Sequence, residues 1–268
     1  MVFDLMDNPK TTHLVQQVLV SARDYELRDD YRERLFRDDS DILVQLVHPE
    51  IFPDCTDTIS PQGIVAIVDV PEADLLVDQM DSDAATVAPM YLVLDGVSDP
   101  GNLGTLLRSS LAVGVSGVVL LPDCCDPWNP KAVRSAMGAS FQIPILETKS
   151  WEETLEMLSK EGGVKSVYAA TMIEEDETNE DGPSASLPYF EVDWTKGASA
   201  LVIGSEGNGL SEIVRQDLVA KSEERTSNGL VVGATHIPME AGIESLNAGV
   251  CGSVILFEYA RQCQQQKE

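Results

Sequence analysis

IPMEAGIESLN, residues 237–247, tells more about the fold than any other stretch of this chain. An apolar run ends at Ile237, a short loop follows, and an apolar helix is predicted from about Ser245 to Gln264. Ser and Asn side chains accept hydrogen bonds from unpaired N–H groups at a helix start. Taken by itself, the stretch is therefore explained by a capped helix that packs on a sheet. Two further Gly-rich strand–loop–helix junctions lie upstream, however, and three such junctions suggest one pocket built from strand ends.

The rest of the chain alternates apolar strand patterns with amphipathic helix patterns. Over residues 86–268 this alternation predicts an α/β domain whose parallel sheet carries helices on both faces. The acidic, weakly apolar segment 174–187 interrupts the pattern and is predicted to be a surface insertion. Residues 1–85 are predicted to form a smaller α/β domain, with an amphipathic helix over 12–37 and an acidic, Ala-rich linker over 71–90.

Composition narrows the class of protein. The 268 residues are 43% apolar, which is typical of a globular chain, and no apolar stretch is long enough to cross a membrane. The net charge of −27 argues against simple electrostatic attraction to nucleic acid. The charge is uneven, because residues 1–90 carry 19 acids against 6 bases whereas residues 91–150 carry 5 against 4. The Gly-rich junctions therefore lie in the least acidic parts of the chain.

Cysteine usage and the first residues bear on the compartment. The five cysteines include the adjacent pair Cys124 and Cys125, and none has the CxxC spacing or Cys/His clustering of a zinc site. We therefore expect no metal and a reduced intracellular compartment. The first residues do not have the pattern of a signal peptide. A removed transit peptide would leave no trace, so a mitochondrial or plastid location stays open beside a cytoplasmic one.

The first upstream junction is LDGVSDPGNLGTLLR, residues 94–108. Its glycines allow close approach of another chain or a ligand, and Asn102 stands where the helix is expected to begin. Arg108 lies six residues further on. An arginine after two leucines is often a surface residue, but open α/β sheets bind ligands at the carboxyl ends of strands, where this helix begins. Both interpretations of Arg108 stay open.

The second upstream Gly-rich junction is GSEGNG, residues 204–209, and between the two junctions lies PKAVRSAMGA, residues 130–139, which is predicted to be a short helix. Lys131 and Arg134 share one helix face, where they could neutralise phosphates or form an ordinary solvated pair. The GSEGNG loop has the order GxxGxG, which is neither the dinucleotide fingerprint GxGxxG nor a P-loop. Glu206 within it could pair with a basic group, hold the loop shape or simply be exposed.

The motifs gain specificity from their order along the chain. They run LDGVSDPGNLGTLLRSS, PKAVRSAMGASFQIP, LVIGSEGNGLS and IPMEAGIESLN, which resembles the SpoU (TrmH-type) 2′-O-ribose RNA methyltransferases of the SPOUT superfamily. The resemblance covers about residues 60–262, and residues 120–129 look most like eukaryotic organellar members. It implies a C-terminal trefoil knot, which periodicity alone would never predict. It also implies S-adenosyl-L-methionine as cofactor, a homodimer, no metal, no membrane, and a partial L30e-like RNA-binding domain over residues 1–85.

The resemblance also implies a role for each matching residue. Arg108 matches the catalytic arginine, and a guanidinium pKa above ~12 makes it a poor base, so binding the phosphate and stabilising the developing alkoxide is the preferred role. The residues that would orient Arg108 and the ribose are Asn102, Glu206, Ser245 and Asn247. The residues that would hold the cofactor are Thr171, Gly204, Gly207, Ile237 and Leu246. Lys131 and Arg134 are the candidates for contacting RNA.

Three functions compete. The leading hypothesis is 2′-O-methylation of a ribose in RNA, with ribosomal RNA favoured over transfer RNA and a splayed-out nucleotide as target. The alternative is a catalytically silent RNA-binding or ribosome-assembly subunit on the same fold, which the acidic charge favours. A nucleotide-dependent oxidoreductase is disfavoured because GxGxxG is missing. The chain also departs from the family pattern at Ala241, where many members have Gly, and at Ala248-Gly249, where Val-Ser is frequent.

Overall fold

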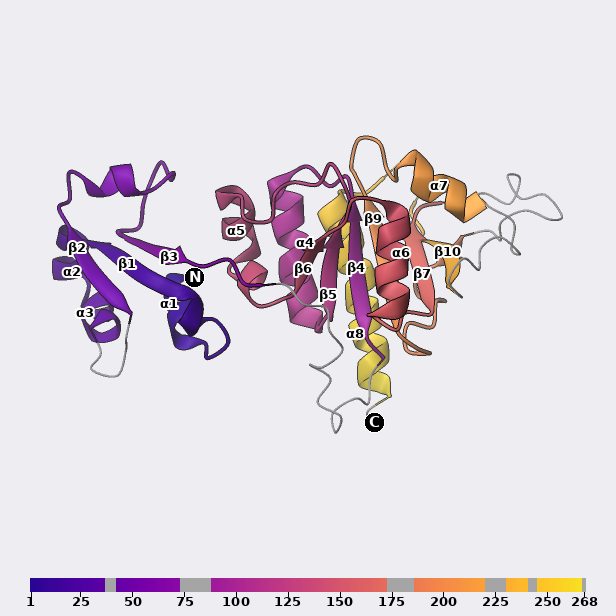
Figure 1. The fold of residues 1–268 in the computed structure, drawn as a ribbon, viewed down its shortest axis with the longest axis horizontal. Coiled ribbons are helices and arrows are strands. Elements are labelled where there is room, and N and C mark those ends of the chain that lie inside the picture. Colours follow the sequence, from indigo (N-terminus) through magenta and orange to yellow (C-terminus); the bar gives the residue numbers. More distant parts are fainter. Residues whose placement is uncertain (37–41, 73–87, 173–185, 220–229, 241–244, 267–268) are drawn as a thin grey trace. The chain divides into compact units, whose positions relative to one another are not determined.

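The structure of the chain is a computed structural model that divides into two compact units, Met1–Glu72 and Ala73–Glu268 (Figure 1). The predicted domain boundary at residues 85 and 86, most of the linker and most of the acidic insertion fall outside the described residues, and so does Ala241. The described residues are 1–36, 42–72, 88–172, 186–219, 230–240 and 245–266.

The first unit is built on a three-stranded sheet within its described residues, in the order β2-β1-β3. The central strand β1 runs parallel to β2 and antiparallel to β3. The strands are β1 (Val15–Ser21), β2 (Leu43–Val47) and β3 (Ile64–Val68). The α-helices are α1 (Val2–Asp7), α2 (Ala22–Leu27) and α3 (Asp29–Leu35), with short 3-10 turns at Thr12–Leu14 and Phe52–Cys55.

The single helix predicted over residues 12–37 is wrong. Its first half is strand β1, and two short helices, α2 and α3, follow. Val18 and Val20 are both fully buried, and a spacing of two is the period of a strand that packs one face on a core. The helical spacing of nearby apolar residues could not exclude this, because a short run rich in β-branched residues fits both patterns.

The second unit contains a sheet of seven described strands in the order β6-β5-β4-β9-β7-β10-β8. Every described pair in it is parallel, so the carboxyl ends of the strands lie along one edge. This confirms the predicted parallel α/β architecture. The strands are β4 (Met90–Asp95), β5 (Gly117–Leu120), β6 (Ile145–Glu147), β7 (Ser166–Ala170), β8 (Leu187–Pro188), β9 (Ser199–Gly204) and β10 (Val231–His236).

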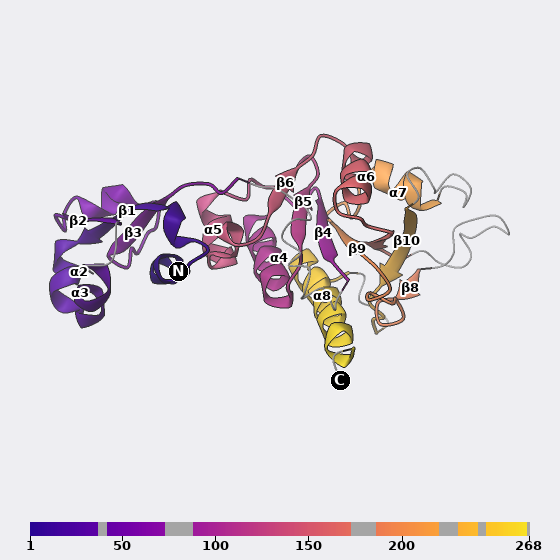
Figure 2. The same cartoon turned by 60° about the horizontal axis from the view of Figure 1, so that its bottom comes forward.

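Helices cover both faces of this sheet, as predicted (Figures 1 and 2). Strand β4 is buried along its whole length, and its alternate residues enter two separate cores. Leu92 and Leu94 pack with residues of α4, α5 and α8 on one face, whereas Tyr91 and Val93 pack with residues of α6 and α7 on the other. The helices are α4 (Pro100–Val113), α5 (Pro130–Ala136), α6 (Trp151–Lys160), α7 (Glu212–Val219) and α8 (Ala248–Gln265), with a 3-10 turn at Ala139–Phe141.

Close packing fixes the position of helix α4 against its neighbour α5. A Cβ atom on Gly104 would lie 2.4 Å from the Cβ of Ser135 and 2.7 Å from the carbonyl oxygen of Ala132, so only glycine fits between the two helices. The helix therefore presents its N-terminus at a fixed place on the carboxyl edge of the sheet. The predicted knot depends on the path between Ile237 and Ser245, part of which lies outside the described residues, and it stays a prediction. Within the described helices, none is long and apolar enough to cross a bilayer.

Candidate functional site

Three adjacent strand ends form one side of the candidate site. Strands β9, β7 and β10 are neighbours in the sheet and run parallel, so their carboxyl ends lie together. Gly204 is the last residue of β9, Thr171 follows β7, and Ile237 follows β10. The backbone N–H of Thr171 donates to the carbonyl oxygen of Thr235 at 2.9 Å, which ties two of these ends directly. The structure thus places three of the predicted cofactor residues at one edge.

A hydrogen-bonded trio of side chains joins three separate segments of the chain. The Oδ1 atom of Asn247 caps α8 by accepting from the N–H of Val250 at 3.1 Å. Its Nδ2 atom donates to the Oδ1 atom of Asn102 at 2.9 Å and also to a carboxylate oxygen of Glu206. Asn102 is buried, with 8% of its surface exposed, and lies in the first turn of α4. Three of the five predicted catalytic residues therefore meet.

The N-terminus of α4 is itself capped, which fixes the direction of Asn102. The carboxylate of Asp99 accepts from the backbone N–H of Asn102 at 2.9 Å, and Pro100 follows at the first helical position. An aspartate cap and a proline after it are both favourable at a helix start. The capping oxygen accepts from one unpaired N–H, and proline has no N–H that needs a partner. This contact with the backbone N–H of Asn102 is the largest cause that lowers the pKa of Asp99. The cap therefore carries a negative charge.

The loop after β9 is held by its own backbone. Ser205 and Gly209 exchange two backbone hydrogen bonds of 2.8 and 2.9 Å, and the N–H of Ser211 donates to the buried carboxylate of Asp95 at 2.6 Å. A Cβ atom on Gly204 would lie 2.4 Å from the carbonyl carbon of Gly209, so the loop can fold back only over a glycine. These contacts set Glu206 where Asn247 can reach it.

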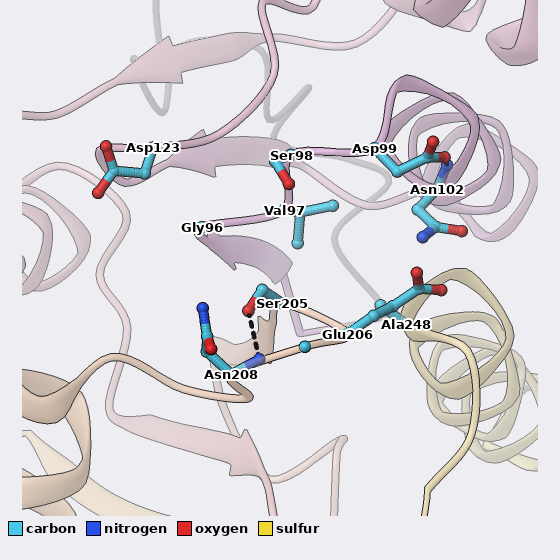
Figure 3. Close-up of a pocket in the computed structure, with 11 residues that line it drawn as sticks. Gly96, Val97, Ser98, Asp99, Asn102, Asp123, Ser205, Glu206, Asn208 and Ala248 are labelled. Atoms are coloured by element: carbon cyan, nitrogen blue, oxygen red, sulfur yellow. Dashed lines mark hydrogen bonds between the residues drawn. The ribbon is translucent and has the colours of Figure 1, made fainter.

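A pocket of about 480 Å³ opens between these segments (Figure 3). Figure 3 shows Asn102 and Glu206 at one end of it and Asp123 and Asn208 at the other, while Ser98 lies between them on the upper wall. Among the residues that the structure describes, neither Lys nor Arg lines the pocket, so the polar side chains described there carry hydroxyls, amides and carboxylates. The lining residues are Gly96, Val97, Ser98, Asp99, Asn102, Asp123, Ser205, Glu206, Gly207, Asn208 and Ala248.

A second hollow of about 280 Å³ adjoins the ends of β5 and β6 and shares Asp123 with the first. It contains the adjacent thiols of Cys124 and Cys125. Burial is the main cause that raises the pKa of Cys124 to about 11, and burial likewise raises the pKa of Cys125. Both thiols are therefore protonated near neutral pH, and thiols in that state are weak nucleophiles. Among the described residues, no group of three His, Cys, Asp or Glu side chains is placed to hold a metal ion.

Several other predicted residues are not among the residues that line the pocket. Arg108 is exposed on α4 and makes no hydrogen bond or ion pair with any described residue. Lys131 forms an exposed ion pair with Asp99, with Nζ and Oδ2 3.5 Å apart, while Arg134 is exposed on the same short helix. Ser245 and Leu246 precede α8, next to residues 241–244, which are outside the described part of the chain.

Sequence reasoning did not single out five of the polar residues that line the pocket: Ser98, Asp99, Asp123, Ser205 and Asn208. The Asp99-Pro100 pair carries a recognisable helix-start pattern, so Asp99 could have been found as a cap. Asp123 has no such local pattern, because it reaches the pocket through a turn in which its φ is 66°.

The contribution of the trio to the stability of the fold can be tested by substituting Asn247. Asn247→Ala removes the cap of α8 and leaves the Oδ1 atom of Asn102 without its donor, so we expect the free energy of unfolding to fall by about 1 kcal/mol or somewhat more. Asn247→Ser restores a capping oxygen but cannot reach both partners, and should recover only the cap contribution. Urea unfolding followed by circular dichroism measures both. Unchanged stability in Asn247→Ala would show that the trio holds nothing together.

The chain is similar to several known proteins. The chain is 32% identical over 251 residues to the Homo sapiens protein named rRNA methyltransferase 3, mitochondrial, covering 82% of this chain and 57% of that protein. It thus spans little more than half the length of the mitochondrial relatives it matches. It is 29% identical over 249 residues to the Bacillus subtilis 23S rRNA (guanosine(2553)-2′-O)-methyltransferase RlmP, covering 91% of this chain and 84% of that one.

Solved structures agree with these relatives. The chain is similar to the SpoU methyltransferase AviRb of Streptomyces viridochromogenes, with a TM-score of 0.65, 25% identity and coverage of 94% of this chain and 83% of that one. It is also similar to the AdoMet-bound rRNA methyltransferase of Sinorhizobium meliloti, with a TM-score of 0.61, 25% identity and coverage of 92% and 80%. Residues 89–257 match the model of the SpoU rRNA Methylase family, and the chain belongs to that family.

Proposed function

We propose that this chain transfers a methyl group from S-adenosyl-L-methionine to the 2′-hydroxyl of a ribose in RNA, with ribosomal RNA favoured over transfer RNA. The observation that carries the proposal is the trio of Asn102, Glu206 and Asn247, which unites three junctions at the carboxyl edge of a parallel sheet. Open α/β sheets bind ligands at this edge. Membership of the family and relatives named as rRNA methyltransferases support the same reaction.

The adjacent strand ends suit the cofactor. Backbone groups at Gly204, Ile237 and Leu246 would hold its adenine and methionine parts, with Thr171 and Gly207 beside them. The Cα of Gly207 faces open space, since a Cβ there would meet nothing within 4 Å, so the loop leaves room for a ligand. When bound, the cofactor supplies an electrophilic methyl group on a sulfonium. The neutral thioether it leaves behind needs no metal to stabilise it.

The protein's part in the reaction is to position the ribose and stabilise its oxygen. Arg108 is exposed and makes no hydrogen bond or ion pair with the described residues, so its guanidinium is available to bind the phosphate next to the target ribose and stabilise charge on the 2′-oxygen. Asn102 and Glu206, fixed by Asn247, would orient the nucleotide. Lys131 and Arg134 would contact RNA phosphates, although the Lys131 ammonium is already close to Asp99.

The assembly proposed is a homodimer. Val250 and Phe257 lie seven residues apart on α8, on one face of the helix, and about half of each side chain is exposed (48% and 55%). An apolar pair of this kind at the surface suits a contact with a second copy of the chain. Named relatives occur in mitochondria and in bacteria, so both an organellar and a cytoplasmic site of action are compatible with the proposal.

A catalytically silent RNA-binding or ribosome-assembly subunit is the second candidate. The net charge of −27 favours it, because RNA affinity is dominated by phosphate contacts. The complete set of Asn102, Arg108, Glu206, Ser245 and Asn247 weighs against it, since a silent subunit has no need of all five catalytic positions.

Calorimetric titration separates the two candidates. S-adenosylmethionine and S-adenosylhomocysteine are titrated into the purified chain, and transfer of labelled methyl to unmodified ribosomal RNA transcripts is measured in parallel. We expect micromolar binding at one site per subunit and label in the 2′-O-methylnucleosides. A folded protein that binds neither compound would refute the methyltransferase and leave the silent subunit.

A further inference from the structure

The trio of Asn102, Glu206 and Asn247 leaves one donor and one acceptor unused. Among the described residues, neither the Nδ2 atom of Asn102 nor the Oε2 atom of Glu206 has a partner in a hydrogen bond or an ion pair. Both side chains line the pocket, and Figure 3 shows the amide of Asn102 and the carboxylate of Glu206 pointing toward one another from α4 and from the loop after β9. A free N–H group and a free carboxylate oxygen therefore lie at the same end of the pocket.

The hydrogen bonds of the trio decide which atom of each amide is free. The backbone N–H of Val250 is a donor, so the atom of Asn247 that caps α8 must be its oxygen. The nitrogen of Asn247 is then the atom that faces Asn102, and it requires an oxygen there. The nitrogen of Asn102 is left over and can donate to a ligand. An ionised carboxylate only accepts, so the free oxygen of Glu206 is available as an acceptor.

We propose that Glu206 is the general base of the reaction: its Oε2 atom takes the proton of the ribose 2′-hydroxyl while the Nδ2 atom of Asn102 donates to the same oxygen. This inference rests on the proposed function, because it assumes that a ribose enters the pocket at the end where these two side chains lie. A hydroxyl group donates one hydrogen bond and accepts others, so a free acceptor beside a free donor matches it. A phosphate oxygen would instead meet the negative charge of Glu206.

The other ionisable groups near the trio are less suited to take this proton. Both carboxylate oxygens of Asp99 are in use, since one accepts from the backbone N–H of Asn102 and the other pairs with Lys131. The contact at the helix start also lowers the pKa of Asp99, which makes it a weaker base. Asp123 lies at the other end of the pocket (Figure 3). The guanidinium of Arg108 holds its own proton too tightly to accept another group's proton after losing it.

The proton has a defined path. As the 2′-oxygen bonds to the methyl carbon, the oxygen loses electron density, and its proton becomes acidic enough for a carboxylate to accept. The proton passes to the Oε2 atom of Glu206, and the electron pair of the O–H bond stays on the 2′-oxygen. The electron pair of the broken bond between carbon and sulfur stays on the sulfur, which leaves as a neutral thioether. Glu206 is exposed, so the proton then passes to water and the carboxylate is restored.

Glu206→Gln tests the base without dismantling the trio. The glutamine side chain has the same length and offers an amide oxygen to Asn247, but it cannot take up a proton. We expect the rate of methyl transfer to unmodified large-subunit ribosomal RNA to fall by about 100- to 10,000-fold, the range that a general base contributes. Calorimetric affinity for S-adenosylmethionine, filter-binding affinity for the RNA and the free energy of unfolding in urea should all stay close to those of the wild type.

The pH dependence of the rate separates a base from a residue that only positions the ribose. A protonated carboxyl group cannot take the hydroxyl proton, so the single-turnover rate of the wild type should fall as the pH is lowered and Glu206 gains a proton. Glu206→Gln has no group to protonate at this position and should lose that fall on the acid side. Glu206→Asp keeps a carboxylate, so it should regain the fall together with part of the rate.

Other charged groups surround Glu206 and its loop, and they are the same in the wild type and in each variant. They are Asp99 at the start of α4 with its partner Lys131 on α5, Asp123 after β5, and Arg215 on α7, which binds the carbonyl oxygen of Asn208. The first turn of α8, which meets Glu206 through Asn247, carries no charged side chain. A fall in rate that disappears only in Glu206→Gln therefore belongs to Glu206.

Glu212→Gln is the matched control. Glu212 is an exposed acid in the first turn of α7, outside the pocket, where it accepts a hydrogen bond from Gln216. The same chemical change there should leave the rate and its pH profile unchanged.

The outcomes separate the base from the reaction as a whole. Full rate in Glu206→Gln, a reduced rate that still falls in acid, or a wild-type profile without that fall would overturn the assignment of the base and leave the methyltransferase standing. A loss of affinity or stability in Glu206→Gln as large as its loss of rate would likewise assign Glu206 to binding and not to proton transfer. No methyl transfer by a folded wild-type chain would overturn the proposed function, and the base with it.

Discussion

Arg108→Ala should lower the rate of methyl transfer by about 100- to 1,000-fold while the affinity for S-adenosylmethionine stays unchanged. The magnitude is that of removing one donor to a developing oxyanion. Affinity for the cofactor should be kept, because Arg108 lies on α4 and the three strand ends proposed to hold the cofactor belong to β7, β9 and β10. Single-turnover methylation and calorimetry on the same preparation measure the two quantities.

Two variants sharpen the interpretation of Arg108. Arg108→Lys keeps the positive charge but loses the forked pair of donors, so it should recover only part of the rate. Lys165→Ala removes an exposed cation just before β7, at the opposite edge of the sheet, and should leave the rate unchanged. Full activity in Arg108→Ala would exclude the arginine from the reaction and would mean that a different group stabilises the 2′-oxygen.

Gly204→Ala should disrupt the site at the end of β9, where the loop from Ser205 to Gly209 begins. The added Cβ would lie 2.4 Å from the carbonyl carbon of Gly209 and 2.6 Å from the backbone nitrogen of Leu210, and backbone atoms cannot turn aside as side chains do. The loop from Ser205 to Gly209 must therefore move. We expect the free energy of unfolding to fall by about 1–3 kcal/mol, as is typical of overpacking. Affinity for S-adenosylmethionine should fall by at least about tenfold, because a 1.4 kcal/mol loss of binding corresponds to that factor.

Gly197→Ala is the matched control for this prediction. A Cβ atom on Gly197 would approach nothing closer than the Cγ of Lys165 at 4.0 Å, so the same chemical change should leave stability and binding close to the wild type. Urea unfolding and calorimetry measure both variants. Wild-type behaviour of Gly204→Ala would mean that the close approach of the loop to the end of β9 does not exist in solution.

The sequence predicted the architecture of the second unit well, because its strands are short apolar runs and its helices have amphipathic patterns. It failed at β1, where seven residues carry an apolar spacing that a helix and a strand share. The difference was decided by pairing with β2 and β3, which are about 30 and 50 residues away in sequence. No local pattern contains that information.

The candidate site was predicted in part. The positions of Asn102, Glu206 and Asn247 followed from motifs at strand ends, and the structure joins their side chains by hydrogen bonds. Asp123 and Asn208 escaped sequence reasoning, since their place in the pocket depends on a left-handed turn and a folded-back loop. The roles of Arg108, Ser245 and Leu246 stay predictions.

The hydrogen bonds of Asn247 to Asn102 and Glu206 have a consequence for when the proposed site forms during synthesis of the chain. Asn102 and Asn247 are 145 residues apart, and Asn247 stands at the start of α8. A ribosome makes the chain from the N-terminus, so the sheet strands emerge long before the last bond partner exists. A nascent chain that ends before α8 would carry β4, α4 and β9 without an ordered site. The proposed site therefore stays incomplete on the ribosome that makes the chain until the final helix has been translated and has docked.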